Sequence, residues 1–492
     1  MTLAPATEAE RDRALEVLLG ADLEPIVDMV GWSPAPGVYD VASADGAVRF
    51  RRDPDGGAFT VDWVSGANPL AVQDQTRFAG LEAERATPHP RRDQNSYPNA
   101  FEQFAQVFDH SSAPDLCVIH SPSHHWAEHG GHLGEHGSLD VIQARAPFIV
   151  SGAGVARLGM ADLGCRLVDV APTMLRVLSA EGRLSRQDGE VVEPIVAEPG
   201  RARYLIGFLW DGANPNVLYD LAARGEAPNV ARLIGEGTAC RYGALASLPT
   251  VTLANHTGIL TGSHPGHHGI LHNAWIDRRT GAQVITNSPS TWATSMQRLN
   301  DGVETLHHAV KRQFPGVHTA SINEPCDAGA DYSTFGLVRS GSRPEPPPGP
   351  EDLPDATIRF VRPSKDYRWA SRSDHTAVDQ FQKLWGDRDA RPPTFTWVNF
   401  TLTDSAFHEG GPYSEMAVSA VRDSDARLGR ILEAVERAGV LSDCAFFLVA
   451  DHGMEESDPG VRGDWDEALA AAGVPVRDEG YGFLYLTDHG AG

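Results

Sequence analysis

The chain has 492 residues, of which 41% are hydrophobic, and a formal net charge of -25 at pH 7. This composition permits a large folded core, and the negative charge argues against a protein that follows nucleic-acid phosphates with a basic surface. No stretch approaches the roughly 20 consecutive apolar residues of a membrane helix, and the first residues lack the basic and apolar regions of a secretion signal, so we expect a cytoplasmic protein.

Short apolar runs alternate with amphipathic helices along the chain, which predicts an α/β fold with a mostly parallel central sheet and helices on both faces. We expect its strands at Leu116 to His120, Phe148 to Ser151, Tyr204 to Trp210, Val317 to Ile322, Phe395 to Thr401 and Ala445 to Ala450. The expected helices are Ala171 to Leu178, Val230 to Glu236, Glu304 to Gln313, Ala377 to Trp385 and Ser414 to Ala438. Two stretches rich in turn residues, 182–201 and 340–354, are expected to be a linker and a Pro-rich loop.

Three of the expected strands are followed by an aspartate, and two of these aspartates have a histidine close behind. The residues are Asp211, Asp404, His408, Asp451 and His452. An aspartate after a single strand is more often a helix cap or turn residue. Because the carboxyl ends of parallel strands meet at one edge of a sheet, three such strands predict a metal site there. Oxygen and nitrogen ligands without a thiolate fit zinc well and manganese less well.

Thr252 precedes a short helical run, LANHTGILTG, and is expected at or near a helix N-terminus. Backbone N–H groups and the helix dipole favour an anionic group at that position. A threonine hydroxyl becomes a useful nucleophile only when a metal or a base lowers its pKa. Taken alone, the residue is better explained as an ordinary helix cap, so its role depends on its surroundings.

Five sequence elements resemble the alkaline phosphatase superfamily, specifically its nucleotide pyrophosphatase/phosphodiesterase branch. They are DG at 211, PNVARLIGEG at 228, PTVTLANHTGILTGSHPGHHGILHN at 249, DSAFH at 404 and ADHGM at 450. The resemblance implies an alkaline-phosphatase-like α/β fold and a covalent phosphothreonine intermediate. It also implies two divalent metal ions, zinc in the first place, with manganese as the other option.

The motifs of this family imply a role for each site residue. Thr252 corresponds to the nucleophile and metal ligand, and Asn273 to the side-chain donor to a phosphoryl oxygen. The ligands of the two metals would be Asp211, Asp451 and His452 for the first, and Asp404 and His408 for the second. Leu253 and Ala254 replace the aromatic residue and proline of the family pattern, which alters the wall beside the nucleophile and weakens the case for a nucleotide substrate.

The elements that close the family's sequence stand near the front of this chain, as GEHGSLDVIQARAPFIVSGAGV from 134 and LVDVAPTMLRVL from 167. The resemblance therefore implies a circularly permuted single catalytic domain over 1–492. Residues 1–181 would match the family's C-terminal part and 202–492 its N-terminal part, joined by the linker 182–201, with a specificity region at about 275–395. His136, in the HG turn, would complete the second metal site. The competing residues are His120, His124, His125, His129 and His132.

These observations predict a phosphoric ester hydrolase, namely a metal-dependent phosphodiesterase or nucleotide pyrophosphatase that acts on a small phosphorylated substrate. Phosphonate hydrolysis and phosphomonoester hydrolysis stay open, because both share the metals and the threonine. A non-catalytic metal-holding protein is a remote alternative, since it predicts a lost ligand or nucleophile and none is missing. Neither a nucleic-acid polymer nor a membrane is an expected partner, and the oligomeric state is not predicted.

Overall fold

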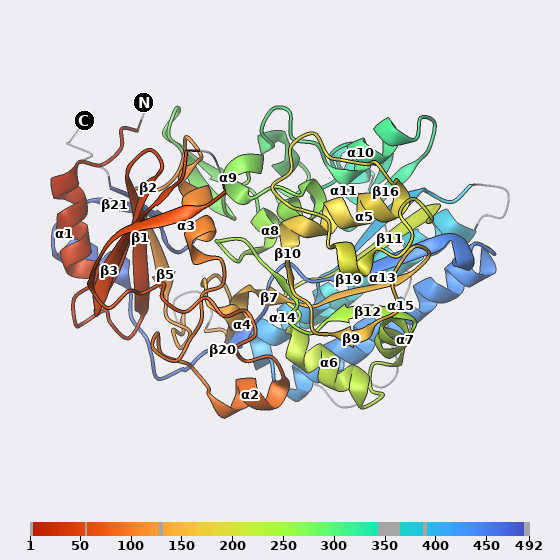
Figure 1. Cartoon of the computed structure of the whole chain (residues 1–492), viewed down its shortest axis with the longest axis horizontal. Coiled ribbons are helices and arrows are strands. Elements are labelled where there is room, and N and C mark those ends of the chain that lie inside the picture. The colour runs from red at the N-terminus through yellow and green to blue at the C-terminus, as the bar shows by residue number, and fades with distance from the viewer. Residues whose placement is uncertain (1–2, 55–56, 127–130, 343–364, 387–390, 487–492) are drawn as a thin grey trace.

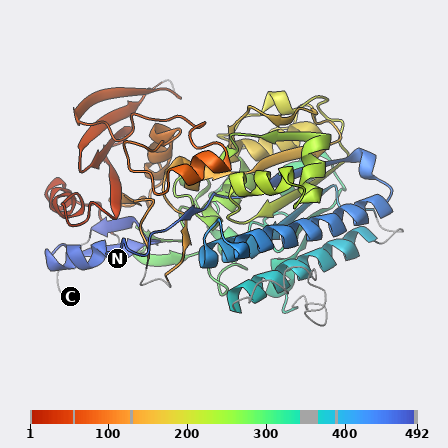
Figure 2. The same ribbon diagram turned by 90° about the horizontal axis from the view of Figure 1, so that it is seen from below.

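A computed structural model describes residues 3–54, 57–126, 131–342, 365–386 and 391–486 (Figure 1). Two large sheets lie side by side, each with its own helices and hydrophobic core (Figures 1 and 2). None of the described helices is both long and apolar enough to span a bilayer.

The central sheet has eight strands in the order β17-β16-β18-β11-β19-β8-β12-β9. Their bounds are β17 (Tyr332–Ser333), β16 (Thr319–Ile322), β18 (Phe395–Phe400), β11 (Tyr204–Trp210), β19 (Cys444–Val449), β8 (Phe148–Gly152), β12 (Gly237–Cys240) and β9 (Gly159–Ala161). The strands from β17 to β19 run parallel, whereas β8 runs antiparallel to both of its neighbours. The predicted α/β class is confirmed, with a mixed sheet in which β8 and β9 come from the first part of the chain.

Helices cover both faces of this sheet. In Figure 1, α5 (Val170–Leu178) and α10 (Leu306–Gln313) lie above its strands, and α7 (Pro228–Glu236) and α15 (Glu415–Arg437) lie below. The long helix α13 (Lys365–Gly386) packs along α15. The other helices around the sheet are α6 (Pro215–Ala223), α8 (Thr252–Thr261), α11 (Thr334–Arg339) and α14 (Leu402–Gly410). The buried apolar stripes of α7 and α15 explain why helical periodicity was visible in the sequence.

The second sheet has seven strands, all antiparallel, in the order β21-β22-β5-β1-β2-β3-β4. Their bounds are β21 (Val476–Glu479), β22 (Phe483–Leu486), β5 (Leu116–His120), β1 (Val27–Ala35), β2 (Val38–Ser43), β3 (Gly46–Arg52) and β4 (Phe59–Gly66). On its two sides lie α3 (Ala100–Phe108) and the pair α1 (Glu8–Leu18) and α16 (Trp465–Ala471). The first and last strands of the described chain both flank β5.

The prediction that Leu116 to His120 belongs to the central sheet was wrong. This segment is β5, in the second sheet, where Cys117 and Ile119 enter one hydrophobic core and Leu116 and Val118 the other. A strand that is buried on both faces has a continuous apolar sequence in a parallel and in an antiparallel sheet alike. The apolar pattern therefore could not distinguish a strand of the central sheet from one of the second sheet.

The segment 182–201, predicted as a linker, is packed against the protein. Ile195 is fully buried, and a Cβ at Gly189 would lie 1.8 Å from the Val168 carbonyl oxygen. At its end, the Ala202 N–H donates to the Val177 carbonyl (3.2 Å). The end of α5 and the start of β11 therefore lie next to each other.

Within the region 275–395, β16 is a strand of the central sheet and α10 packs against β16. Most of the Pro-rich stretch 340–354 lies outside the described residues. The shorter elements are α2 (Leu81–Ala86), α4 (Val141–Ala144), α9 (Pro265–His268), β6 (Gly134–Glu135), β7 (Arg145–Ala146), β10 (Cys165–Arg166), β13 (Ala244–Leu245), β14 (Ala274–Asp277), β15 (Ala282–Ile285) and β20 (Glu455–Glu456).

Candidate metal centre and active site

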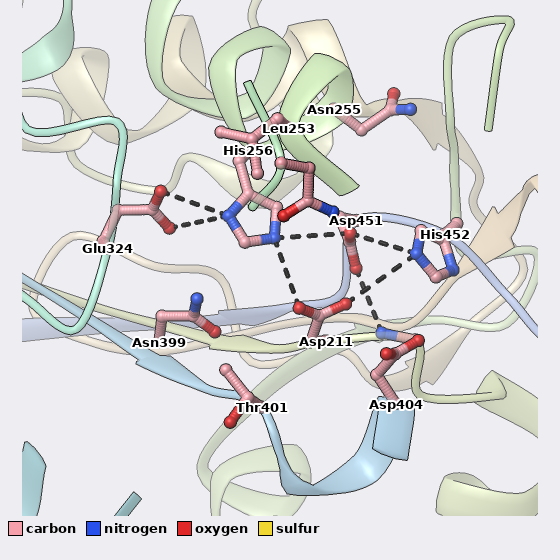
Figure 3. A network of polar contacts seen from close by, with 12 residues as sticks. Asp211, Leu253, Asn255, His256, Glu324, Asn399, Thr401, Asp404, Asp451 and His452 are labelled. Atoms are coloured by element: carbon pink, nitrogen blue, oxygen red, sulfur yellow. Dashed lines mark hydrogen bonds and ion pairs between the residues drawn. The ribbon is translucent and has the colours of Figure 1, made fainter. Parts of the chain in front are cut away.

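Asp211, Asp451 and His452 meet at the carboxyl ends of β11 and β19, and we call them the inner group (Figure 3). His452 Nε2 lies 3.2 Å from Asp451 Oδ2 and 3.8 Å from Asp211 Oδ1. All three side chains are buried. The structure thus brings together the three residues that the family resemblance assigned to one metal.

Asp404, His408 and His136 form a second cluster, the outer group. Asp404 and His408 lie one turn apart on α14, directly after β18, and His408 Nε2 is 3.3 Å from Asp404 Oδ1. His136 Nε2 lies 3.9 Å from the same oxygen, although His136 precedes Asp404 by more than half of the chain. The rings of His136 and His452 stack with centroids 3.6 Å apart, so the two groups are adjacent.

Of the competing histidines, His132 lies 3.5 Å from Glu135 and its ring is 4.5 Å from that of His408. His129 is outside the described residues. His124 and His125 are buried beside Gly463 and Ser457 respectively. His136 is therefore the described histidine of this stretch that comes within 4 Å of Asp404.

Backbone carbonyls orient the three imidazoles. The Nδ1 atoms of His136, His408 and His452 lie 2.8, 2.7 and 2.9 Å from the carbonyl oxygens of Thr250, Gly134 and Gly453. A nitrogen that faces a carbonyl must carry the proton, which leaves the lone pair on Nε2. In each case Nε2 points at the carboxylates, which is the arrangement that protein metal sites use to fix a histidine ligand.

Among the described residues, three sets of side chains could each hold a divalent metal: Asp211, Asp451 and His452; His136, Asp404 and His452; and His132, Glu135 and His408. Among the described residues, Asp211 Oδ1, Asp404 Oδ1, Asp451 Oδ2 and His452 Nε2 are buried and have no hydrogen-bond partner. Burial and the neighbouring Asp451 and Asp404 carboxylates raise the pKa of Asp211 well above its ordinary value. Ligands about 2.0 Å from a tetrahedral zinc are about 3.3 Å apart, close to the separations within the inner group. A dication would relieve the repulsion among these carboxylates and satisfy the unpaired atoms.

Thr252 is the first residue of α8, and it lines a cavity of about 140 Å³ together with Asp211 and Asp404. The N-cap of α8 is Val251, and no side-chain hydrogen bond caps this helix. The capping explanation for Thr252 therefore does not hold. The Asn273 side-chain oxygen accepts a hydrogen bond from the Leu253 N–H (3.3 Å), which places Asn273 at the same helix end.

The sequence analysis missed two residues next to the inner group, namely His256 and Glu324. His256 Nε2 lies 3.3 Å from Asp451 Oδ2, and its Nδ1 lies 3.0 Å from Glu324 Oε2 (Figure 3). Although burial opposes the charge, Glu324 and Asp451 raise the pKa of His256 well above its ordinary value. Trp397 Nε1 also donates to Glu324 (3.3 Å). Glu324 stands two residues after β16, so the strand-end pattern could have revealed it.

Asn255, in the same TLANH motif, shapes the loop before the nucleophile. Its side-chain NH2 donates to the carbonyls of Ser247, Pro249 and Val251, and its side-chain oxygen accepts from the Ser247 N–H (2.8 Å). These four bonds hold the backbone that presents Thr252.

Comparison with known proteins identifies a family that the sequence matches. The sequence model of the type I phosphodiesterase / nucleotide pyrophosphatase family matches residues 205–490, more than half of the chain. Venom phosphodiesterase 2 from Crotalus adamanteus is 26% identical over 234 residues, which cover 46% of this chain and 24% of that protein. Alkaline phosphatase PafA from Elizabethkingia meningoseptica is 30% identical over 118 residues, which cover 24% of this chain and 20% of that protein. The matched part thus spans about a quarter of these relatives or less.

The solved structure of murine ectonucleotide pyrophosphatase / phosphodiesterase 5 is also similar, with a TM-score of 0.35 and 16% identity over 51% of this chain and 57% of that one. The match of the family's sequence model carries the assignment. The chain belongs to the type I phosphodiesterase / nucleotide pyrophosphatase family.

Proposed function

We propose that the protein is a metal-dependent phosphodiesterase of the nucleotide pyrophosphatase type that uses Thr252 as its nucleophile and two zinc ions. The observation that carries this proposal is the position of Thr252, in one cavity with Asp211 and Asp404 and at the N-terminus of α8. The inner and outer groups would each hold one ion. When bound, these ions would lower the pKa of the threonine hydroxyl and offset the negative charge of the phosphoryl oxygens.

The chain's own residues then account for both chemical steps. Thr252 Oγ1 loses its proton and forms a bond to phosphorus as the bond to the leaving oxygen breaks, and that oxygen takes up a proton. The product is a phosphothreonine that still carries the retained group. Water cleaves this ester in the second step, restores the hydroxyl and releases the remaining phosphoryl product. The Asn273 NH2 group and the backbone N–H groups at the start of α8 would donate to the phosphoryl oxygens that do not react.

The cavity at Thr252 favours a flat apolar group on the part of the substrate that is retained. Its outer wall holds Trp292, Phe335 and Trp369, and the Trp292 ring lies 5.9 Å from Trp369 and 6.3 Å from Phe335. Such aromatic surfaces stack on a nucleobase or an aryl ring. Leu253, which replaces the family's aromatic residue, lines the same cavity, so the stacking surface would come from these other positions.

Assays of the zinc-loaded protein against bis-p-nitrophenyl phosphate, p-nitrophenyl phosphate and a p-nitrophenyl phosphonate test this function. We expect the diester to be hydrolysed with the highest kcat/KM, and chelation of the metal to abolish the activity. A preference for the monoester or the phosphonate would assign the chain to one of the two alternative activities. No hydrolysis of any of the three would leave the metal-holding role.

We also propose that the catalytic fold is circularly permuted within its family. Three observations support this: β8 completes the central sheet beside β19, His136 joins the outer group, and α5 ends beside the start of β11. In the family order, that last junction would be the site of the two termini. Circular permutation is tolerated where chain ends lie close together.

Re-permutation of the gene tests this proposal. A chain that reads 202–492, a flexible linker and then 1–181 should fold, melt in a single transition and bind the same two metals. A control chain opened within β8 should not fold, because its break removes a strand from the sheet. Failure of the first chain, or two independent melting transitions in the natural one, would contradict the permutation.

A further inference from the structure

A second cavity, of about 220 Å³, lies next to the outer group. It is lined by Val251, Asn273, His136 and His408, whereas Thr252 and Asp404 line the cavity described above. The linings of the two cavities come close to each other at Asp404 and His408, whose side chains are 3.3 Å apart. Val251 and Thr252, neighbours in the chain, face one cavity each.

The far wall of this cavity belongs to the second sheet. Val118 and His120 of β5, Phe483 of β22 and Tyr481 from the turn before β22 contribute to it. Trp126 completes the wall, with its ring 5.4 Å from that of Tyr481 and 5.7 Å from that of His120. Half of the Tyr481 surface is exposed, which puts this residue at the mouth. The second sheet thus contributes residues to a cavity that His136 and His408 also line.

The lining of this cavity combines apolar side chains and the rings of Trp126 and Tyr481 with five histidines, Glu135 and Asn273. Among the described residues that line it, none is a lysine or an arginine, and Glu135 adds a carboxylate. Burial lowers the pKa of His272 to about 3, so this imidazole is neutral at pH 7. Apart from the metal that the outer group would hold, the described lining offers a pyrophosphate leaving group no arginine or lysine, the usual partners of phosphate groups.

In-line displacement places the leaving oxygen on the side of phosphorus opposite the nucleophile. With Thr252 facing the first cavity, the leaving group of a bound substrate would extend into the second. We propose that this second cavity is a leaving-group subsite for an uncharged apolar alcohol, preferably an aromatic one. The inference rests on the proposed function and restricts it to phosphodiesters, with pyrophosphate-releasing substrates disfavoured.

Two substrates with the same retained group test the subsite. The p-nitrophenyl ester of thymidine 5′-monophosphate releases a phenol, and thymidine 5′-triphosphate releases pyrophosphate. Because the two leaving groups differ in intrinsic reactivity, the informative quantity is the change in the ratio of their kcat/KM values on substitution. Tyr481→Ala should lower kcat/KM for the aryl ester by roughly 5- to 10-fold, the usual value of an aromatic contact, and leave the triphosphate less affected.

Tyr481→Lys gives a change in the opposite direction that loss of structure would not produce. It should raise kcat/KM for the triphosphate while lowering that for the aryl ester. Trp63→Ala, at a partly exposed tryptophan on β4 of the same sheet, is the matched control and should leave the ratio unchanged. Binding of bis-p-nitrophenyl phosphate to the zinc-loaded Thr252→Ala protein, measured by calorimetry, should weaken when Tyr481→Ala is added.

The outcomes separate this inference from the proposed function. If zinc-loaded wild type hydrolyses no phosphodiester, the proposed function and the subsite both fail. If it hydrolyses bis-p-nitrophenyl phosphate but Tyr481→Ala changes neither this activity nor binding, only the subsite is overturned. A wild-type preference for the triphosphate over the aryl ester would also overturn it.

Discussion

The inner and outer groups hold the same kinds of side chain in different surroundings. In the inner group the side chains of Asp451 and His452 have no exposed surface, and His256 and Glu324 support them from behind. In the outer group the side chain of Asp404 is 23% exposed and that of His408 is 16% exposed. The inner group comes entirely from strand ends after residue 200, whereas the outer group takes His136 from the first part of the chain. The outer metal should therefore be the more exchangeable one, and the more dependent on how the first part docks.

The largest effect is expected at Thr252, which lines one cavity with Asp211 of the inner group and Asp404 of the outer group. Thr252→Ala should lower kcat by about 10⁴-fold or more, as removal of a catalytic nucleophile does, because water cannot replace it at a comparable rate. Thr252→Ser should keep part of the activity. Both variants should keep the fold and most of the metal, and metal analysis measures the metal content. Near-native kcat in Thr252→Ala would contradict covalent catalysis.

Asn273→Ala should lower kcat by roughly 10²- to 10³-fold, the usual cost of one lost oxyanion donor. Both metal groups should remain filled, because Asn273 contacts the helix end at Leu253 and is not one of the carboxylate or imidazole residues of either group. Steady-state kinetics separate the possibilities. A change in KM alone would show uniform binding and remove Asn273 from the transition state.

His136→Ala tests the difference between the two groups directly. Loss of this imidazole should lower the affinity for the metal of the outer group by at least about 10- to 100-fold. Losing a residue that only supports a metal ligand already has this cost. The metal of the inner group should stay in place. Equilibrium dialysis with elemental analysis measures both. Two full equivalents in His136→Ala, together with metal loss in His129→Ala or His132→Ala, would move the ligand and contradict the outer group.

A smaller effect should appear where the first part of the chain docks. His267 lies between Asp109 and Asp188, with nitrogen–oxygen distances of 2.9 and 2.8 Å. Burial opposes its charge, but the two carboxylates raise the pKa of His267 to about 9. Because the folded-state pKa exceeds the unfolded value of about 6.5, this stabilisation is complete below about pH 6.5 and is lost as the pH rises through 9.

His267→Gln should therefore lower the free energy of unfolding by on the order of 1 kcal/mol at pH 6, given its partial exposure, and by much less at pH 10. Chemical denaturation of both proteins at the two pH values measures the difference. Arg279→Gln, at a strongly exposed arginine, is the control and should change little. An equal effect of His267→Gln at both pH values would show that the contact does not depend on charge.

The strand-end residues could be predicted from the sequence because each is a local signal. Asp211 and Asp451 follow the apolar runs that fold as β11 and β19. Asp404 lies in the first turn of α14, which follows β18. His256 and Glu324 could not be paired in this way, since 68 positions separate them and only the fold brings their side chains together.

The second sheet was missed although its sequence carried a signal. β2 and β3 are joined by two residues, Ala44 and Asp45, before Gly46, which is a typical hairpin pattern. Its strand β5 is apolar throughout because both faces are covered, so it resembled a central strand. The leaving-group subsite could not be predicted at all, because its wall combines residues near 120 with residues near 481.

The stereochemical course at phosphorus tests the central claim, catalysis through Thr252, most directly. A diester made chiral at phosphorus with sulfur would be hydrolysed in water enriched in ¹⁸O, and the configuration of the product determined. Two successive in-line displacements, one by Thr252 and one by water, predict overall retention of configuration. Inversion would show a single direct attack by water and would contradict the phosphothreonine intermediate.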